Sequence, residues 1–355
     1  MSELSSPRQR RGTRGPAPVS DVNLRDVARR AGVSAATVSR VFSGHAPVSE
    51  DTRTKVLDAA RELGYIMNSL ARAMLGTGQR TLAFVAGDLT DRSTADMARG
   101  AEQVTGRHGH GMLVSLSHGD PEEEHAIIAA MCEQRVAGVV LAGTSVPGKA
   151  GDERIAAYAH ELAAVGAKLV LCGHPHIPSE PNVLVVNYDN LGGVRNVVRY
   201  LTEKGHTRIA FLGWTDSPAA SQRFLGYSLG MKDAGLVIES SLVVECANEI
   251  VEAHLATLLL LNQKTPPSAI VCLSDSVAMG VYRAARDLGV KIPDQLAVTG
   301  FDDYPCDTDL TPPLTTIAAP YFEVGVRAGE LALGLVPPES RVELRTELIV
   351  RDSTG

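Results

Sequence analysis

Residues 31–43 read AGVSAATVSRVFS, a run of small side chains and hydroxyl groups with a single arginine. Gly32 is typical of a helix C-terminus, and Ser34 of the N-cap of a following helix. In that second helix Val38 and Val41 share one face. The other face carries Ala35, Ala36, Thr37, Ser39 and Arg40. The stretch therefore predicts a helix-turn-helix whose outer face is almost free of bulk.

Helical patterns continue on both sides of this stretch. NLRDVARRAG precedes it and SEDTRTKVLDAARELG follows it, so we expect three short helices within residues 23–64. Asn23 and Ser49 occupy the other two N-cap positions, and Gly44 and Gly64 follow helices. Residues 1–20, rich in Pro, Gly, Ser and Arg, are expected to form a disordered basic tail.

Charge is divided unevenly along the chain. Residues 1–80 contain 13 Lys+Arg and 7 Asp+Glu, a net charge of +6, whereas the rest of the chain carries a net charge of −13. A basic unit attached to an acidic body indicates that the basic unit binds a polyanion.

The bare outer face of the second helix suits the major groove of DNA, where the backbone must approach the base edges. On this interpretation Ala35 and Ala36 contact thymine methyl groups, and Arg40 binds guanine O6 and N7. The phosphate ligands are Ser34, Thr37 and Ser39. The alternative is a small helical bundle whose short side chains only pack.

From residue 81 the pattern changes to β-branched runs that alternate with amphipathic helices. The first series of expected buried parallel strands is TLAFVAG, GMLVSLS, AGVVLAG and KLVLCG, with helices at 93–109, 121–135 and 152–166. The second series is VLVVNYD, RIAFLGW, LVVE, AIVCLS and LAVTGFDD. Two such series predict two doubly wound α/β lobes, with a ligand cleft at the carboxyl ends of their strands.

Patterns of catalysis and metal binding are missing from the sequence. No G-x-S-x-G, H-E-x-x-H or Walker pattern occurs, and Gly87-Asp88 lacks the other glycines of a dinucleotide fingerprint. His108-x-His110 and His174-x-His176 fall in loops without nearby cysteine, which favours solvated histidines. We therefore expect no enzyme activity, no cofactor and no metal.

The polar start MSELSSPRQRRGTRGPAP has no apolar core of a signal peptide, and no run of 18 apolar residues occurs. We expect a cytoplasmic protein with no membrane partner.

LRDVARRAGVS, ATVSRV, VS, TR and GYIMN resemble, in order and spacing, the DNA-binding region of the lactose-repressor (LacI/GalR) family of bacterial transcription regulators. Further along, VNYDNLGGVRNVVRYLTEKGHTRIAFLG, SDSVAMGVYRAARDLGVKIP, VTGFDD and PPLTTI resemble the family's effector domain, which is similar to periplasmic sugar-binding proteins. The resemblance implies a homodimeric repressor that binds a palindromic double-stranded DNA operator and a small-molecule effector, with a carbohydrate among the candidates. The alternative is a soluble small-molecule-binding protein of the periplasmic-binding-protein type.

The resemblance also implies a hinge helix at residues 68–76 that enters the minor groove at the operator centre, with a flexible linker as the alternative. Met74 stands where the family usually has a wedging leucine, with Leu75 beside it as the other candidate wedge, and Met67 replaces the usual proline. The complete set of expected DNA-binding residues is Asn23, Leu24, Ser34, Ala35, Ala36, Thr37, Ser39, Arg40, Asn68, Ala71, Arg72 and Met74.

The effector-binding residues implied by the resemblance are Arg223, Ser274, Asp275 and Asp302. Arg223 matches the arginine that grips the effector, and its fork of donors suits paired hydroxyls or a carboxylate. Asp302 matches a carboxylate that accepts from ligand donors, although a salt bridge with Arg223 that braces the lobes is the alternative. Asp275 has the alternative role of a helix N-cap.

One segment departs from the family pattern. In ECANEIVEAHL, residues 246–248 are Cys-Ala-Asn where the family often has Gly-Asp and an aromatic residue. We therefore expect no aromatic floor for a sugar ring at this point.

The expected domains follow from these patterns and the resemblance. They are a helix-turn-helix DNA-binding domain at 21–66, a hinge helix and linker at 67–79, and a two-lobed effector-binding and dimerisation domain at 80–355. Chain crossings near 178, 320 and 348 divide the latter into an N-lobe of 80–178 and 321–348 and a C-lobe of 179–320 and 349–355.

Overall fold

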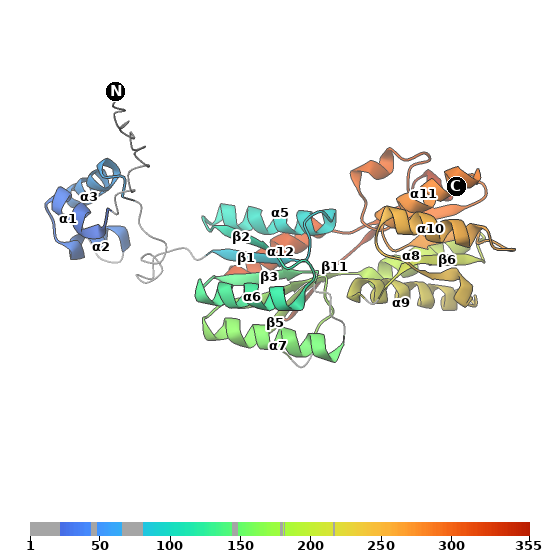
Figure 1. Ribbon diagram of the computed structural model, residues 1–355, viewed down its shortest axis with the longest axis horizontal. Coiled ribbons are helices and arrows are strands. Elements are labelled where there is room, and N and C mark those ends of the chain that lie inside the picture. Colours follow the sequence, from blue (N-terminus) through green and yellow to red (C-terminus); the bar gives the residue numbers. More distant parts are fainter. Residues whose placement is uncertain are drawn as a thin grey trace, which may run out of the picture. The chain divides into compact units, whose positions relative to one another are not determined.

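The computed structural model describes residues 22–43, 48–65, 81–143, 148–177, 180, 182–215 and 217–355. The chain divides into two compact units, Met1–Gln79 and Arg80–Gly355 (Figure 1). Within the described residues, every helix is too short or too polar to cross a lipid bilayer.

The first unit is a three-helix domain. Its helices are α1 (Leu24–Ala31), α2 (Ala35–Ser43) and α3 (Glu50–Glu62). Asn23 and Asp26 form a capping box at the start of α1, and Gly32 ends that helix with a φ of 69°. The core between the helices consists of Val27, Ala28, Val38, Val41, Val56, Ala59 and Ala60. The helix-turn-helix predicted from residues 31–43 is thus present.

The second unit contains two α/β lobes, as predicted. The N-lobe is a parallel sheet in the strand order β11-β5-β4-β3-β1-β2. Its strands are β1 (Leu82–Ala86), β2 (Met112–Leu116), β3 (Gly138–Ala142), β4 (Lys168–Cys172), β5 (Val183–Tyr188) and β11 (Arg341–Leu344). Its helices are α5 (Arg92–Arg107), α6 (Pro121–Glu133), α7 (Lys149–Ala164) and α12 (Tyr321–Leu333).

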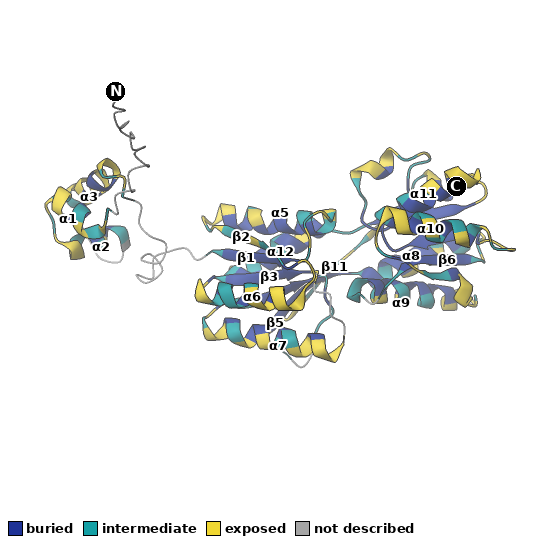
Figure 2. Ribbon diagram, viewed as in Figure 1, coloured by how far each residue is buried: buried dark blue, intermediate teal, exposed yellow. Residues whose placement is uncertain are grey.

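Alternate side chains of the N-lobe strands enter two separate cores. Leu82 and Phe84 of β1 pack with α5 and α12, whereas Ala83 and Val85 pack with α6 and α7. Figure 2 shows the strands buried between these helix layers and the outer helix faces exposed. Both faces of the sheet are covered, which explains the uninterrupted apolar strands.

The C-lobe is a smaller parallel sheet in the order β7-β6-β8-β9. Its strands are β6 (Ile209–Trp214), β7 (Val243–Glu245), β8 (Ala269–Cys272) and β9 (Ala297–Thr299). Its helices are α8 (Asn190–Glu203), α9 (Pro218–Asp233), α10 (Ile250–Leu261) and α11 (Asp275–Leu288). Short 3-10 helices occupy Ser240–Leu242, Pro305–Thr308 and Asp352–Thr354. An antiparallel pair, β10 (Thr316–Ala318) and β12 (Glu347–Ile349), lies where the chain passes between the lobes.

The first crossing between lobes was wrongly placed near 178. Strand β5 pairs with β4 and β11, so the N-lobe continues to Tyr188 and the chain crosses just before α8. The second crossing precedes α12, close to the expected residue 320. The third lies between β11 and β12, at residues 345–346 rather than 348. The sequence analysis assigns VLVVNYD to the second series, because the residues of a parallel strand do not show to which sheet the strand belongs.

Strand β2 also differs from the prediction, which made it a buried strand. It is the last strand of the N-lobe sheet, and Leu113 and Val114 are 37% and 44% exposed. Apolar composition does not reveal whether a strand is central or at an edge.

Two glycines set the packing of α5 against α12. A Cβ atom on Gly100 would collide with the backbone oxygen of Phe322, and one on Gly325 with the backbone oxygen of Met97. The helices therefore cross with their backbones in close approach, which places the first turns of α5 and α12 side by side at the cleft.

Candidate functional site

The outer face of α2 is as bare as the sequence predicted. Ala35, Ala36 and Arg40 are exposed, while Val38 and Val41 are buried against α1 and α3. Thr37 and Ser39 are half-buried at the edges of this face. We call α2 the recognition helix.

Three of the expected DNA contacts also have structural roles. The Ser34 hydroxyl accepts from the backbone N–H of Thr37 at 3.1 Å and bonds the Thr37 hydroxyl at 2.8 Å. Asn23 is occupied as the cap of α1, accepting from the N–H of Arg25 at 2.9 Å. Leu24 is half-buried and packs on the core of the first unit. The expected hinge residues Asn68, Ala71, Arg72 and Met74 lie outside the described residues.

Between the two lobes lies a cavity of about 340 Å³. The N-lobe contributes residues at the start of α5 and at the ends of β4 and β5, and the C-lobe contributes the first two turns of α9. The cavity is therefore at the carboxyl ends of strands, where a ligand site was predicted.

Arg223 of α9 reaches the inner wall of this cavity and is only 5% exposed. Its Nε donates to Oδ1 of Asn190 at 2.8 Å, and one terminal nitrogen donates to the carbonyl of Leu273 at 2.6 Å. The other terminal nitrogen lies 3.4 Å from the hydroxyls of Tyr188 and Tyr321.

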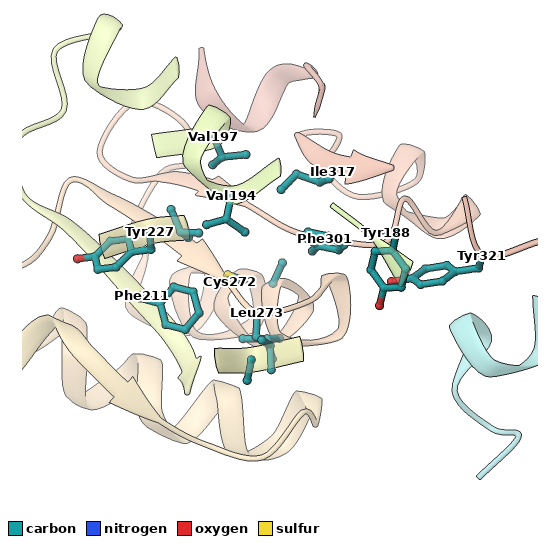
Figure 3. Close-up of a cluster of buried hydrophobic side chains, with 14 of the residues drawn as sticks. Tyr188, Val194, Val197, Phe211, Tyr227, Cys272, Leu273, Phe301, Ile317 and Tyr321 are labelled. Atoms are coloured by element: carbon teal, nitrogen blue, oxygen red, sulfur yellow. The ribbon is translucent and has the colours of Figure 1, made fainter. Parts of the chain in front are cut away.

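The guanidinium group lies over the face of one aromatic ring, and two further rings contact each other nearby. Its carbon lies 3.5 Å from the ring centre of Phe301, and Tyr188 meets Tyr321 edge-to-face at 5.1 Å. Figure 3 shows Tyr188, Phe301 and Tyr321 together at one end of a buried cluster. We call Tyr188, Arg223, Asp302 and Tyr321 the inter-lobe cluster.

Asp302 completes this cluster. Its Oδ1 lies 3.8 Å from a terminal nitrogen of Arg223 and accepts a hydrogen bond from the Tyr321 hydroxyl. Burial raises the pKa of Asp302 to about 8, because the attraction of Arg223 only partly offsets the loss of solvent. Its φ of 128° is unusual for a residue with a side chain, and such strain is typical of functional sites.

The raised pKa of Asp302 predicts that stability falls as the pH rises. The carboxyl of the unfolded chain has a pKa of about 3.9, so the folded state binds the extra proton between that value and about 8. Its contribution is complete below pH of about 4 and is lost as the pH rises towards 8, at no more than about 1.4 kcal/mol per pH unit. The measurement is urea unfolding of the unmodified chain and of Asp302→Asn at several pH values. If the difference in free energy of unfolding between the two proteins does not change with pH, the raised pKa of Asp302 is contradicted.

The structure places Ser274 and Asp275 behind the cavity wall rather than in its lining. Ser274, not Asp275, is the N-cap of α11, and its hydroxyl bonds Oδ1 of Asn248. Asp275 is fully buried and accepts from the Thr316 hydroxyl at 2.6 Å and from the Tyr304 backbone N–H at 3.2 Å. The expected direct contact of Asp275 with an effector therefore has no support from its position, and it braces the chain segments that follow β9.

Several residues that line the cavity were not predicted. Among them are Asp91, His174, Tyr188, Asn248 and Tyr321. His174, expected to be a solvated loop histidine, is 9% exposed and its Nδ1 lies 2.7 Å from the carbonyl of Pro175. The rule that ligands lie beyond strand carboxyl ends points to His174 after β4 and to Tyr188 at the end of β5. It also points to Asn248, three residues after β7, whereas Asp91 and Tyr321 lie at the starts of helices.

Asn248 lines the cavity at the position where the family often has an aromatic residue. At this point the cavity wall is therefore an amide side chain rather than an aromatic ring. Among the described residues, no group of three or more His, Cys, Asp and Glu side chains is arranged to hold a metal ion.

A helix-turn-helix unit and a two-lobed unit with an inter-lobe cavity, joined in one chain, define a DNA-binding transcriptional regulator with a ligand-binding domain. Residues 23–68 match the model for bacterial regulatory proteins of the lacI family, and residues 198–354 match that for a periplasmic binding protein-like domain. The HTH-type transcriptional repressor CytR of Escherichia coli (strain K12) is 30% identical over 337 residues, which cover 93% of this chain and 96% of that protein. The chain belongs to the LacI family of bacterial transcriptional regulators, which confirms the resemblance seen in the sequence.

Solved structures agree with this assignment. The Lac repressor dimer bound to operator and the anti-inducer ONPF has a TM-score of 0.81 and 25% identity, covering 94% of this chain and 99% of that chain. The complex of the transcriptional regulator CelR with cellobiose has a TM-score of 0.68 and 27% identity, with the same coverage.

Proposed function

We propose that this protein is a ligand-responsive homodimeric repressor, which binds a near-palindromic DNA operator and holds a small effector between its lobes. One observation carries the proposal above all others. A helix with Ala35, Ala36 and Arg40 on its exposed face belongs to a basic unit, and the same chain contains a cavity lined by both lobes.

The exposed face of the recognition helix supports base contacts in the major groove. Methyl-sized side chains at Ala35 and Ala36 allow the helix backbone to approach the base edges closely. Arg40 supplies the paired donors that match guanine O6 and N7. Hydroxyls at Ser34, Thr37 and Ser39 then serve as phosphate ligands, and the capping bonds of Ser34 and Thr37 hold these two hydroxyls in place.

Replacing Arg40 with Ala is expected to weaken binding to the preferred operator by about 10- to 100-fold, because a paired guanine contact is worth about 1–3 kcal/mol of discrimination. Binding to unrelated DNA should change much less. Arg61→Ala is the matched control, since Arg61 lies on α3 with its side chain 80% exposed. Fluorescence anisotropy with operator and scrambled duplexes measures both affinities, and an Arg40→Ala protein with unchanged discrimination would remove Arg40 from the recognition surface.

An apolar stripe on α10 supports the homodimer. Val251, Leu255 and Leu259 follow one another at four-residue spacing and are 57%, 56% and 76% exposed. Contiguous exposed apolar side chains on a helix mark an interaction surface. We propose that a second copy of this chain covers the stripe, since the Lac repressor compared above is a dimer.

The cavity supports a small, polar effector. Its volume of about 340 Å³ lies in the range of small-molecule sites, and side chains such as Arg223, Asp302 and Asn248 converge on it. The related regulator CelR was solved with cellobiose, so a carbohydrate is a natural candidate. With Asn248 in place of an aromatic residue, hydrogen bonds rather than ring stacking would hold the ligand on that side.

We further propose that the protein acts by binding alone, without catalysis, and that it works in the cytoplasm, where bacterial chromosomal DNA is found. Its relatives include transcriptional repressors, which act in this way.

Selection of bound sequences from random DNA, with and without candidate sugars, tests the proposed function. The expected result is enrichment of one near-palindromic sequence with two half-sites, whose recovery changes when the effector is present. Absence of any enriched sequence at moderate salt, with every ligand tried, would overturn the proposal.

A further inference from the structure

Besides the inter-lobe cluster, a further side chain of the C-lobe forms a hydrogen bond with the N-lobe. Tyr304 follows β9 in the C-lobe, and Asp91 precedes α5 in the N-lobe. The Tyr304 hydroxyl donates to Oδ1 of Asp91 at 3.1 Å. The two residues are 213 positions apart in the chain and belong to different lobes, so their contact depends on how the lobes pack together.

Tyr304 is held firmly on its own lobe. Its backbone N–H donates to Oδ2 of the buried Asp275 at 3.2 Å. The preceding Asp303 has a φ of 60° and forms an ion pair with Arg351 at 2.5 Å. These contacts fix a backbone conformation that residues with side chains rarely adopt, and they direct the phenol at the opposite lobe.

Asp91 is both a helix cap and part of the cavity wall. Its Oδ1 accepts from the Ser93 backbone N–H at 3.0 Å as well as from Tyr304. Within the part of the chain that the structure describes, its Oδ2 has no hydrogen-bond partner. Since Asp91 lines the cavity, this second oxygen is available to a hydroxyl or amino group of a ligand and is unfavourable for an anionic group.

We propose that Tyr304 is a positioning residue of the effector cavity, which orients the Asp91 carboxylate of the N-lobe from the C-lobe. The proposal rests on the proposed function in one respect, namely that the cavity holds the effector. Because the partners belong to different lobes, Asp91 is oriented only while the lobes are closed. Recognition of a donor group at this end of the ligand is thereby tied to lobe closure.

Hydrogen exchange of the full chain, without DNA or ligand, tests the contact directly. In Tyr304→Phe, we expect the amides of residues 92–95 to exchange about tenfold faster, because a hydrogen bond to a charged group is lost. Residues 100–105, in the middle of α5, should exchange as before. Tyr282→Phe is the matched control, since it removes a tyrosine hydroxyl that donates to the Pro312 carbonyl at 2.8 Å within the C-lobe.

A second variant approaches the contact from the other lobe. Asp91→Ser keeps a helix-capping side chain but is too short to reach Tyr304, and it should speed exchange of residues 301–304 in the C-lobe. The double variant Asp91→Ser/Tyr304→Phe should exchange in that segment no faster than the faster single variant.

Three outcomes would overturn the proposal. Exchange of residues 92–95 in Tyr304→Phe could stay within about twofold of the unmodified chain, the two substitutions could act additively, or Tyr282→Phe could produce the same change. A failure of the proposed function would appear instead as absence of operator or effector binding, with these exchange rates unaffected.

Discussion

Replacing Arg223 with Ala should lower the free energy of unfolding by about 3–5 kcal/mol and abolish the response to effector. The guanidinium group serves four partners at once, namely Asn190, Leu273 and the two hydroxyls of Tyr188 and Tyr321. Its removal leaves these buried polar groups unsatisfied and takes away the cation next to Asp302. Effector response is lost because the cavity loses its inner wall.

A surface arginine provides the control for this substitution. Arg195 pairs with Asp233 at 2.6 Å, but both side chains are about half exposed and solvent screens the pair, so Arg195→Ala should leave the free energy of unfolding almost unchanged. Urea unfolding gives both stabilities, and anisotropy gives operator affinity with and without effector. Binding of operator by Arg223→Ala at temperatures where it remains folded should be unchanged. If Arg223→Ala is as stable as Arg195→Ala and still responds to effector, the inter-lobe cluster neither stabilises the fold nor forms part of the effector site.

Gly325→Ala is expected to destabilise the N-lobe by about 3 kcal/mol, although alanine is the better helix former. The added methyl group would collide with the backbone oxygen of Met97 on α5, and a backbone atom cannot move aside without displacing the helix. Because Asp91 caps the start of α5 and α12 begins at Tyr321, and both residues line the cavity, a shift between the helices should also weaken effector binding.

Gly106→Ala on α5 is the matched control for this prediction. The nearest atom to its added methyl group would be a side-chain oxygen of Glu102 at 3.6 Å, an ordinary contact. Gly106→Ala should therefore leave stability unchanged or raise it by up to about 1 kcal/mol. Thermal and urea unfolding compare the two variants, and equal stabilities would contradict the close packing of α5 on α12.

Local patterns in the sequence predicted whole elements well. The caps at Asn23, Ser34 and Ser49 and the apolar spacing of Val38 and Val41 sufficed for the first unit, because caps and helix faces depend on residues within one or two turns. The strand runs sufficed for two α/β lobes, because a parallel sheet buried on both faces needs uninterrupted apolar strands. The sequence did not show that β5 belongs to the N-lobe, because the pairing of strands depends on contacts between residues that are far apart in the chain.

For the candidate site, too, the sequence predicted single residues but not the contacts between them. Arg223 and Asp302 were expected from the family pattern, but the pattern did not show that Tyr321, 98 residues from Arg223, would share this cluster. Nor did it show that Asp275 lies behind the cavity wall while His174 lies in it. Burial and hydrogen-bond partners at these positions depend on how the lobes close.

The sequence alone determined what each segment is: a helix with a bare outer face in a basic unit, two series of strands and helices, an arginine on a helix and a carboxylate after a strand. These properties depend on residues that are close together in the sequence, because the periodicity of a helix or strand is set within a few residues. Only the tertiary structure decided which distant groups meet, as Tyr304 meets Asp91 across the cleft. The reason is that the pKa of Asp302 and the orientation of Asp91 depend on solvent exclusion and contacts that exist only once both lobes are packed together.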